Sequence, residues 1–216
     1  MSTVLLVRHG LTAMTGPVLA GRTPGVHLDD RGIKQAAAVA ARIAPVPLTA
    51  IVTSPLERCV ETAEAVLAAQ REAGREPDWI VDEQLIECGY GAWTGRQIKE
   101  LAKDPLWKVV QAQPSAARFP EGEALSEMAS RAVAAVRNWD RQFGADALGL
   151  HLDQFQRVVV DPCSVTVVRY TDTRPYVLRT NDIGGELSSF APAPKRSRRR
   201  KSDDATVGGG AGSGAV

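Results

Sequence analysis

The residues with the clearest chemical potential are Arg8, His9 and Gly10, which directly follow the apolar run Val4 to Val7. A continuous apolar run of this kind predicts a short strand buried on both faces. In open α/β sheets, ligands bind beyond the carboxyl ends of the strands. Arg8 offers a planar fork of donors that suits phosphate, and His9 is a nitrogen nucleophile that can be neutral near pH 7. The tripeptide therefore suggests a site that binds and attacks an anion, although any tripeptide also recurs by chance.

A second candidate ligand for an anion is Arg58. The preceding residues predict a helix start, with Ser54 as the N-cap, Pro55 at the first helical position and Glu57 closing a capping box. Arg58 then falls in the first turn, where the helix dipole disfavours a cation unless an anion lies nearby. Helix N-termini and arginine side chains both favour phosphate. The alternative is an arginine that is simply solvated.

A candidate general acid is Glu87, the one carboxyl in the apolar, glycine-rich stretch from Leu85 to Gly95. A carboxyl in apolar surroundings can hold a proton for transfer to a leaving group. The alternative is a loop glutamate in solvent, and the local sequence alone does not separate the two.

Three motifs come in the order and at the spacing of one known family. Arg8-His9-Gly10 after an N-terminal strand, Ser54-Pro55-Leu56-Glu57-Arg58, and the glycine-spaced stretch from Glu87 to Gly95 all match the histidine phosphatase superfamily, the phosphoglycerate-mutase-like proteins. The chain resembles this family over roughly residues 3–181. The segment Phe119 to Glu123 also resembles a substrate-side loop of the bacterial phosphatase branch, although a plain helix-entry turn explains it nearly as well.

The resemblance implies a mechanism and assigns roles. His9 is expected to be the nucleophile that forms a phosphohistidine, and Glu87 the proton donor. Arg8 and Arg58 are expected to bind the substrate phosphate, and Thr15 stands where the family pattern prefers an asparagine that helps to hold it. The expected partner is a small phosphorylated substrate, and neither a cofactor nor a metal is required.

Phosphatase activity is favoured over mutase activity because the chain lacks the long insertions around the site that the mutase branch carries. One departure weakens the expectation of activity. Family members carry a second histidine in a His-Gly pair, which here should fall between Phe143 and Leu152. That stretch contains His151, but Leu152 follows it, and His27 lies in the loop after the first strand. The simplest interpretation is that a strand, its His-Gly turn and the start of the next helix are missing, about 20 residues at usual element lengths. The alternative function is therefore a non-catalytic, phosphate-binding relative of the family.

The elements that must position these residues indicate an α/β fold. The resemblance implies a three-layer sandwich with a mostly parallel central sheet and helices on both faces, lacking one central strand. Apolar periodicity and caps predict helices over residues 29–44, 54–73, 98–113 (interrupted by Pro105) and 125–143, strands over 48–53 and 79–81, and a hairpin with arms at 165–170 and 176–179.

Composition narrows the class of protein. The 216 residues are expected to form one domain over residues 1–182 and a disordered tail over 183–216, basic at 195–201 and then glycine-rich. A formal net charge of +1 and the absence of a long apolar run argue against membrane and nucleic-acid partners; only the basic tail could touch nucleic acid, and it lacks aromatic residues for base stacking.

The expectations about cofactors and cellular location rest on motifs that the sequence lacks. Three unpatterned cysteines and no recognisable signal peptide suggest a cytoplasmic protein with reduced thiols. Three scattered histidines argue against a metal site, and no glycine motif of a Rossmann or P-loop nucleotide binder follows a strand. Homodimerisation is left open.

Overall fold

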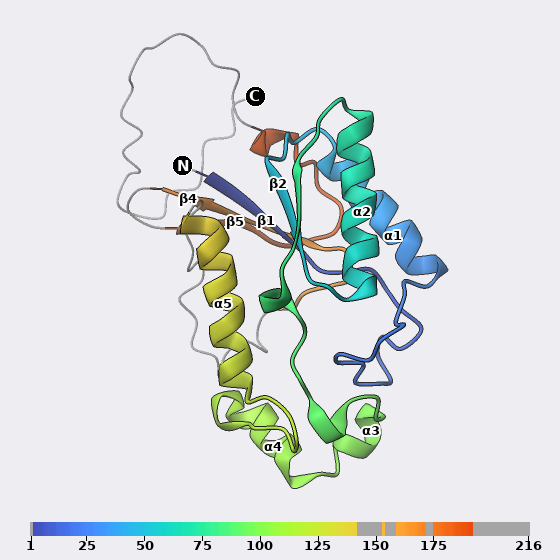
Figure 1. Ribbon diagram of the computed structural model, residues 1–216, viewed down its shortest axis with the longest axis vertical. Coiled ribbons are helices and arrows are strands. Elements are labelled where there is room, and N and C mark those ends of the chain that lie inside the picture. Colours follow the sequence, from blue (N-terminus) through green and yellow to red (C-terminus); the bar gives the residue numbers. More distant parts are fainter. Residues whose placement is uncertain (1, 142–152, 154–158, 172–174, 192–216) are drawn as a thin grey trace.

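The computed structural model describes residues 2–141, 153, 159–171 and 175–191 and has an α/β fold (Figure 1). Strands and α-helices alternate through the first five of these elements, and three α-helices then precede the last two strands. The strands are β1 (Ser2–Val7), β2 (Ala50–Thr53), β3 (Asp78–Val81), β4 (Val165–Tyr170) and β5 (Pro175–Asp182). The α-helices are α1 (Asp30–Ile43), α2 (Glu57–Glu72), α3 (Ile98–Leu101), α4 (Pro105–Ala112) and α5 (Leu125–Arg141). Short 3-10 turns include η1 (Glu83–Leu85), η2 (Gly91–Trp93), η3 (Pro114–Ala116) and η5 (Ser188–Phe190).

The described strands form two small sheets instead of one mostly parallel sheet, so that part of the prediction is wrong. One sheet has the order β1-β4-β5 and is antiparallel throughout, and the other is the parallel pair β2-β3. Parallel strands need a long crossover, which α2 provides between β2 and β3. The connection between β4 and β5 is too short for a crossover, so these strands pair antiparallel, as the predicted hairpin requires.

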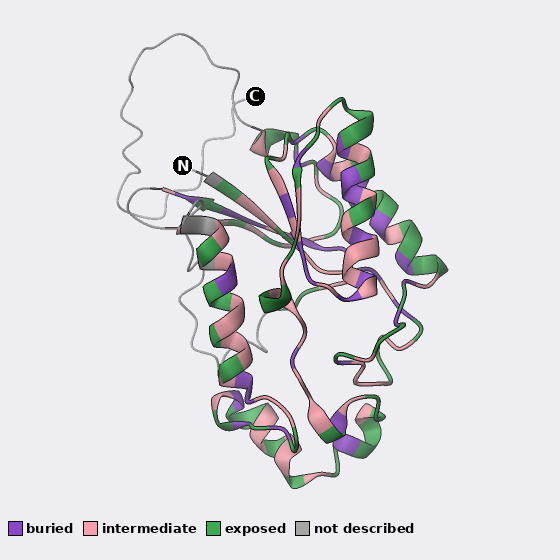
Figure 2. Cartoon of the chain, viewed as in Figure 1, coloured by how far each residue is buried: buried purple, intermediate pink, exposed green. Residues whose placement is uncertain are grey.

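The main core lies between the three-stranded sheet and the helices α1 and α2. It is built from apolar residues of α1 and α2, such as Val39, Ile43 and Val66, packed against Val165 and Val167 of β4. Buried positions alternate with exposed ones along both helices, as expected for helices with one face on a core (Figure 2).

β1 is buried on one face only, contrary to the prediction from its apolar run. Leu5 and Val7 pack against the core, but the side chain of Leu6 points the other way and is 42% exposed. The cause is that successive side chains alternate across a strand, and within the described residues the core covers one face of β1. A sequence typical of an interior strand therefore has an open face here.

A second cluster holds the lower part of the molecule together. Trp93 and Phe119 lie 5.3 Å apart between ring centroids, and Tyr90 meets Phe119 edge-on at 4.8 Å. Leu101 and Leu125 complete the buried set with Cys88 and Ala117. This cluster joins the segment that carries Glu87 to the start of α5.

The N-termini of α1 and α2 show where a local capping signal predicted the start of a helix correctly and where it did not. Asp29 caps α1 as predicted, because its carboxylate accepts the amides of Arg31 and Gly32. The predicted capping box of the next helix is wrong: α2 begins at Glu57, and the Glu57 carboxylate accepts the amide of Gly25 at 2.9 Å. A loop contact from distant sequence therefore replaces the local cap.

The core continues past residue 182, where the domain was expected to end. Leu187 is 1% exposed and belongs to the main core cluster, and Arg42 of α1 donates to the carbonyl oxygen of Gly185 at 3.0 Å. The predicted basic and glycine-rich parts of the tail, and the stretch with His151, lie outside the described residues. No helix in the described ranges combines the length and apolar character that crossing a membrane requires.

Candidate functional site

His9 follows β1 directly and is held in a single tautomer. Its Nδ1 lies 2.7 Å from the carbonyl oxygen of Gly10. Because a carbonyl oxygen only accepts, Nδ1 must carry the proton and donate it. Nε2 then carries the lone pair, and it accepts a hydrogen bond from Nε of Arg58 at 3.3 Å. The nitrogen suited to nucleophilic attack is therefore Nε2, and it faces an arginine.

The surroundings of His9 favour the neutral imidazole. Burial lowers the pKa of His9 below its ordinary value of 6.5, and the positive charges of Arg58 and Arg8 lower it further. The Gly10 carbonyl and the Glu87 carboxylate act in the opposite direction on this pKa without reversing the result. A neutral imidazole at pH 7 keeps its lone pair available for attack.

Arg58 is a buried cation with an unused donor. It is 3% exposed, and its Nη2 donates to the carbonyl oxygen of Gly21 at 2.9 Å. Its Nη1 is buried and has no hydrogen-bond partner among the described residues. A buried donor without a partner is costly, and a buried charge more so, unless a ligand supplies the missing acceptor. The arrangement suits an anion placed between Nη1 of Arg58 and Nε2 of His9.

Thr62, which sequence reasoning missed, ties the two halves of this site together. Its hydroxyl accepts the backbone amide of Gly10 at 3.1 Å and donates to the carbonyl oxygen of Arg58 at 2.7 Å. The turn after β1 and the first turn of α2 are therefore joined through one side chain. The only sequence signal was its place one helical turn after Arg58, which is too common to be informative.

The carboxyl end of β1 also contacts the turn before β4. Arg8 donates through Nη1 to the carbonyl oxygen of Val160 at 2.6 Å, so its guanidinium is fixed by the backbone of that turn. The amide of Cys163 donates to the carbonyl oxygen of Arg8 at 3.1 Å, and Cys163 has a positive φ of 56°. Residues far apart in sequence thus shape the site, and no local pattern predicted this contact.

Thr15 has a structural partner within its own loop. Its hydroxyl accepts the amide of Thr12 at 3.0 Å and lies 3.0 Å from the Thr12 hydroxyl. These bonds close the turn after Gly10. Thr15 therefore stabilises the loop beside His9 in this structure, and its expected contact with phosphate stays a prediction.

Glu87 lies in the electrostatic environment of His9 and is held mainly by its own segment. Its Oε1 accepts the amide of Cys88 at 2.7 Å and the hydroxyl of Tyr90 at 3.4 Å. Burial raises the pKa of Tyr90, and the charge of Glu87 raises it further, so Tyr90 stays a neutral donor to the carboxylate. The structure thus brings His9, Arg58 and Glu87 into one electrostatic neighbourhood, from the end of β1, the start of α2 and the loop before η2.

His27, the other histidine in the described part of the chain, has a different environment. It is exposed and pairs with the carboxylate of Glu61. Across the described ranges, no group of three histidine, cysteine, aspartate or glutamate side chains is arranged to hold a metal ion.

Comparison with known sequences identifies relatives of this chain. Residues 4–146 match the family model described as histidine phosphatase superfamily, branch 1. An uncharacterised protein of Mycobacterium tuberculosis is 37% identical over 110 residues, which cover 48% of this chain and 54% of that protein. A probable phosphoglycerate mutase GpmB of Proteus mirabilis is 33% identical over 144 residues, 64% of this chain and 63% of that protein. The chain thus spans about half to two thirds of these curated relatives.

A longer alignment at lower identity is found with phosphoserine phosphatase 1 of Hydrogenobacter thermophilus. The two sequences are 26% identical over 204 residues, which cover 84% of this chain and 92% of that protein. Among solved structures, YhfR of Bacillus stearothermophilus has a TM-score of 0.74 at 24% identity, covering 85% of this chain and 98% of that one, which shows a shared fold. With the family match extending over most of the described chain and the three motifs in their expected order, this chain belongs to the histidine phosphatase superfamily, branch 1.

Proposed function

We propose that the chain is a phosphomonoester hydrolase that works through a phosphohistidine at His9. The observation that carries the proposal is the buried guanidinium of Arg58. Its Nη1 has no partner in the described structure, and its Nε lies 3.3 Å from Nε2 of His9. A phosphate group placed there would accept the free donor and present phosphorus to the nucleophile.

The chemistry uses side chains alone. Nε2 of His9 attacks phosphorus in line, so that a P–N bond forms as the P–O bond to the leaving alcohol breaks. In the proposed reaction Glu87 acts in its protonated form: it donates its proton to the departing oxygen and becomes a carboxylate. Arg58 and Arg8 stabilise the charge on the equatorial oxygens. Water then attacks phosphorus and loses a proton to the Glu87 carboxylate. The P–N bond breaks, which releases inorganic phosphate and restores the neutral imidazole and the protonated Glu87.

The substrate class is a small phosphorylated molecule. The relatives carry names of both a mutase and a phosphatase. In the mechanism proposed here both reactions begin with the same phosphohistidine step. Transfer back to the substrate instead of to water would make the chain a mutase. Phosphatase activity is the simpler proposal for a chain without long insertions near the site.

We further propose that the second catalytic histidine of the family is missing from this chain. The family match ends at residue 146, just where that histidine and its strand are expected. β1 and β2 belong to separate sheets among the described residues, and the Leu6 face of β1 is open. Loss of one group that stabilises transition-state charge typically lowers the rate by about 10²–10³-fold. Turnover is therefore expected to be weak compared with that of family members that have both histidines.

The direct test is hydrolysis of p-nitrophenyl phosphate by wild type and by His9→Ala. We expect slow turnover by the wild type, trapping of an acid-labile phosphohistidine, and loss of both in the variant, because the nucleophile is removed. His27→Ala is the matched control, since His27 is exposed and bound to Glu61. Turnover that persists in His9→Ala would refute the assignment.

A second candidate function is phosphate binding without turnover, and the missing histidine favours it. In that case calorimetry should detect binding of inorganic phosphate to the wild type and its loss in Arg58→Ala, with no phosphohistidine formed. Arg31→Ala is a suitable control because Arg31 is exposed and pairs with Asp29. Binding that is unaffected by Arg58→Ala would exclude this function and the proposed phosphate site together.

A further inference from the structure

The segment that carries Glu87 is held by Arg131 of α5, far from it in sequence. Nη1 of Arg131 donates to the carbonyl oxygens of Gln84 at 2.8 Å and Ile86 at 2.6 Å. Nη2 donates to the carbonyl oxygen of Glu87 itself at 3.0 Å. One guanidinium thus binds three carbonyls around the expected proton donor, which only a planar fork of donors can do.

Glu123 holds the same segment from its other side. It forms a two-pronged ion pair with Arg131, with Nε to Oε1 at 2.7 Å and Nη2 to Oε2 at 3.0 Å. Its Oε2 also accepts the amide of Gly89 at 2.9 Å, and its own amide donates to the carbonyl oxygen of Gly89 at 2.7 Å. The hydrogen bonds from Arg131 lower the pKa of Glu123 to about 2 against the opposing effect of burial. Glu123 therefore stays charged at any pH near neutrality.

Arg22 links this network to the phosphate side of the site. Its Nε donates to the carbonyl oxygen of Glu87 at 2.7 Å, and its Nη2 donates to Glu123 at 2.8 Å. The preceding residue, Gly21, accepts the hydrogen bond from Nη2 of Arg58. The loop before α1 therefore connects the candidate phosphate ligand to the candidate acid.

The two loops meet backbone to backbone. A Cβ added to Gly122 would lie 2.3 Å from the carbonyl oxygen of Gly89, and one added to Gly91 would lie 2.1 Å from that of Pro120. No other residue type fits at either position without displacing a backbone. The segment from Glu87 to Gly91 is thus fixed by the loop before α5 and by Arg131. Within the described residues, the Glu87 carboxyl itself has Cys88 and Tyr90 as its hydrogen-bond partners.

We propose that Arg131 and Glu123 are positioning residues for Glu87: they fix its backbone so that its carboxyl meets the leaving oxygen of the substrate. This inference rests on the proposed phosphatase function. A proton donor is effective only within hydrogen-bond reach of the atom it protonates, and a small displacement of its backbone lowers the rate of that step. The network should therefore matter most where proton donation limits the reaction.

The test compares two phosphate esters in Arg131→Lys. p-Nitrophenolate leaves as a stable anion and needs little protonation, whereas the alkoxide of glycerol 3-phosphate needs a proton. We expect kcat for glycerol 3-phosphate to fall by about 10²-fold and kcat for p-nitrophenyl phosphate by less than about 3-fold, with KM little changed. Lysine keeps the charge but cannot bind three carbonyls and a carboxylate together.

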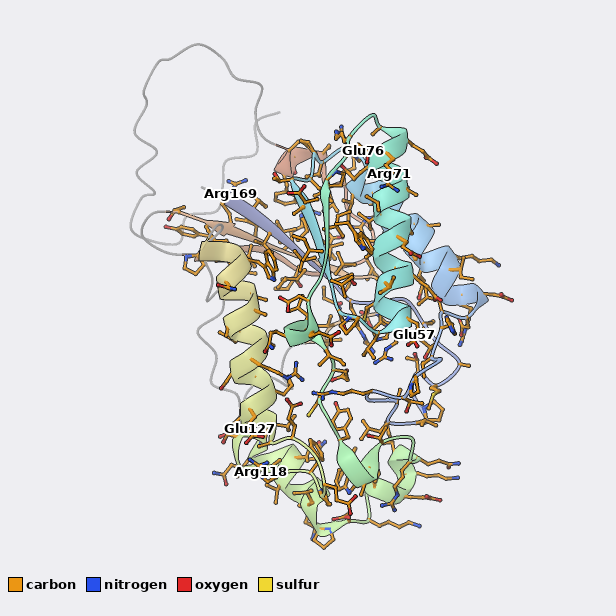
Figure 3. All side chains as sticks on the ribbon, in the orientation of Figure 1. Glu57, Arg71, Glu76, Arg118, Glu127 and Arg169 are labelled. Carbon is orange, nitrogen blue, oxygen red and sulfur yellow. The ribbon has the colours of Figure 1, made fainter. Side chains whose placement is uncertain are left out.

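The matched control is Arg118→Lys. Arg118 also pairs with a glutamate near the start of α5, Glu127, and both side chains lie exposed at the lower end of the molecule (Figure 3). This variant should leave the ratio of the two rates unchanged. Glu87→Gln provides the reference for complete loss of the donor and should show the same selectivity in stronger form.

Different outcomes separate the two proposals. Equal loss on both esters in Arg131→Lys would overturn the positioning role while leaving the phosphatase function intact. If Arg131→Lys does not fold, Glu123→Gln, which has nearly the same shape, is judged by the same ratio. If the wild type hydrolyses neither ester, the proposed function fails. Amide hydrogen exchange then decides: faster exchange confined to residues 86–92 in Arg131→Lys supports the positioning role, and unchanged exchange overturns it.

Discussion

The tautomer of His9 is set by the Gly10 carbonyl, and its pKa is lowered first by burial and then by the charges of Arg58 and Arg8. The Gly10 carbonyl takes the proton on Nδ1, which leaves the lone pair on Nε2 beside Arg58. Arg58, the proposed phosphate ligand, thus adds to the effect of burial in favouring the neutral imidazole of the proposed nucleophile. Its Nη1 has no hydrogen-bond partner among the described residues, which supports the proposal that an anion binds beside it.

The charge state of His9 gives a prediction that does not require activity. Burial and the charge of Arg58 lower the pKa of His9 below 6.5, so the neutral imidazole is the main form at pH 6.5 and above. Arg58→Gln removes one of these two effects, and the pKa of His9 should therefore rise towards 6.5. NMR titration of the imidazole measures this shift. Arg31→Gln should leave it unchanged, and an unchanged titration in Arg58→Gln would contradict the geometry.

At the scale of elements, local sequence signals predicted the bounds of helices and hairpins correctly where those bounds are set by neighbouring residues. Asp29 predicted the start of α1, Pro105 predicted the break between α3 and α4, and the hairpin of β4 and β5 was expected at nearly the observed residues. The start of α2 was misplaced because Glu57 bonds to Gly25, which no window around the helix contains.

Long-range strand pairing accounts for the other differences between the predicted and the observed fold. The antiparallel pairing of β1 with β4 joins strands from opposite ends of the described chain, and sequence periodicity carries no information on which strands become neighbours. The motif residues His9, Arg58 and Glu87 could be named from the sequence because a family pattern marks them. Arg131 and Thr62 could not, since their roles exist only through contacts made after folding.

A carboxylate between α1 and β5 gives a prediction on stability. Asp182 pairs with Arg42 at 2.5 Å, and the side chains are 10% and 16% exposed. Burial alone would raise the pKa of Asp182, but hydrogen bonds from Arg179 and from the amides of Gly184 and Gly185, together with the charge of Arg42, lower it. The carboxylate therefore stabilises the fold above its unfolded pKa of 3.8, and this contribution is lost as the pH falls through the lower folded value.

Asp182→Asn should lower the free energy of unfolding at pH 7 by about 2 kcal/mol, because it removes charge-assisted hydrogen bonds and leaves the half-buried Arg42 without its counter-ion. The difference in unfolding free energy between wild type and variant should become smaller below pH 3.8, because the contribution of the ionised Asp182 to wild-type stability decreases there. Urea unfolding at both pH values measures this. Glu76→Gln is the control, because the Arg71–Glu76 pair is exposed and contributes little to stability; both residues are labelled in Figure 3.

At the scale of the whole molecule, the proposed missing segment should affect folding more than chemistry. A lost donor to transition-state charge costs about 3–4 kcal/mol of rate enhancement. A lost strand removes several apolar side chains at about 1.5–3 kcal/mol each, against a total stability of about 5–15 kcal/mol. Among the described residues, Leu6 is 42% exposed, which is what the proposed loss of a neighbouring strand would leave.

Inserting a strand, His-Gly turn and helix start of a family member after residue 146 should therefore raise the melting temperature. A gain of about 3 kcal/mol corresponds to roughly 6–12 °C for a chain of this size. Differential scanning calorimetry measures the change, and a Gly/Ser insert of equal length is the control. Equal melting temperatures for the two inserted chains would contradict the proposed deletion.

The exposure of β1 has a further consequence, for how copies of the chain meet in solution. Within the described residues β1 pairs with β4 on one edge alone, so the backbone groups of its other edge are open. Natural edge strands usually carry a lysine, a proline or a bulge that prevents pairing with another molecule. Val4 to Val7 contain none of these, since their composition is that of an interior strand. Within the part of the chain that the structure describes, this edge of β1 is available for pairing with another copy, and self-association should therefore grow with protein concentration.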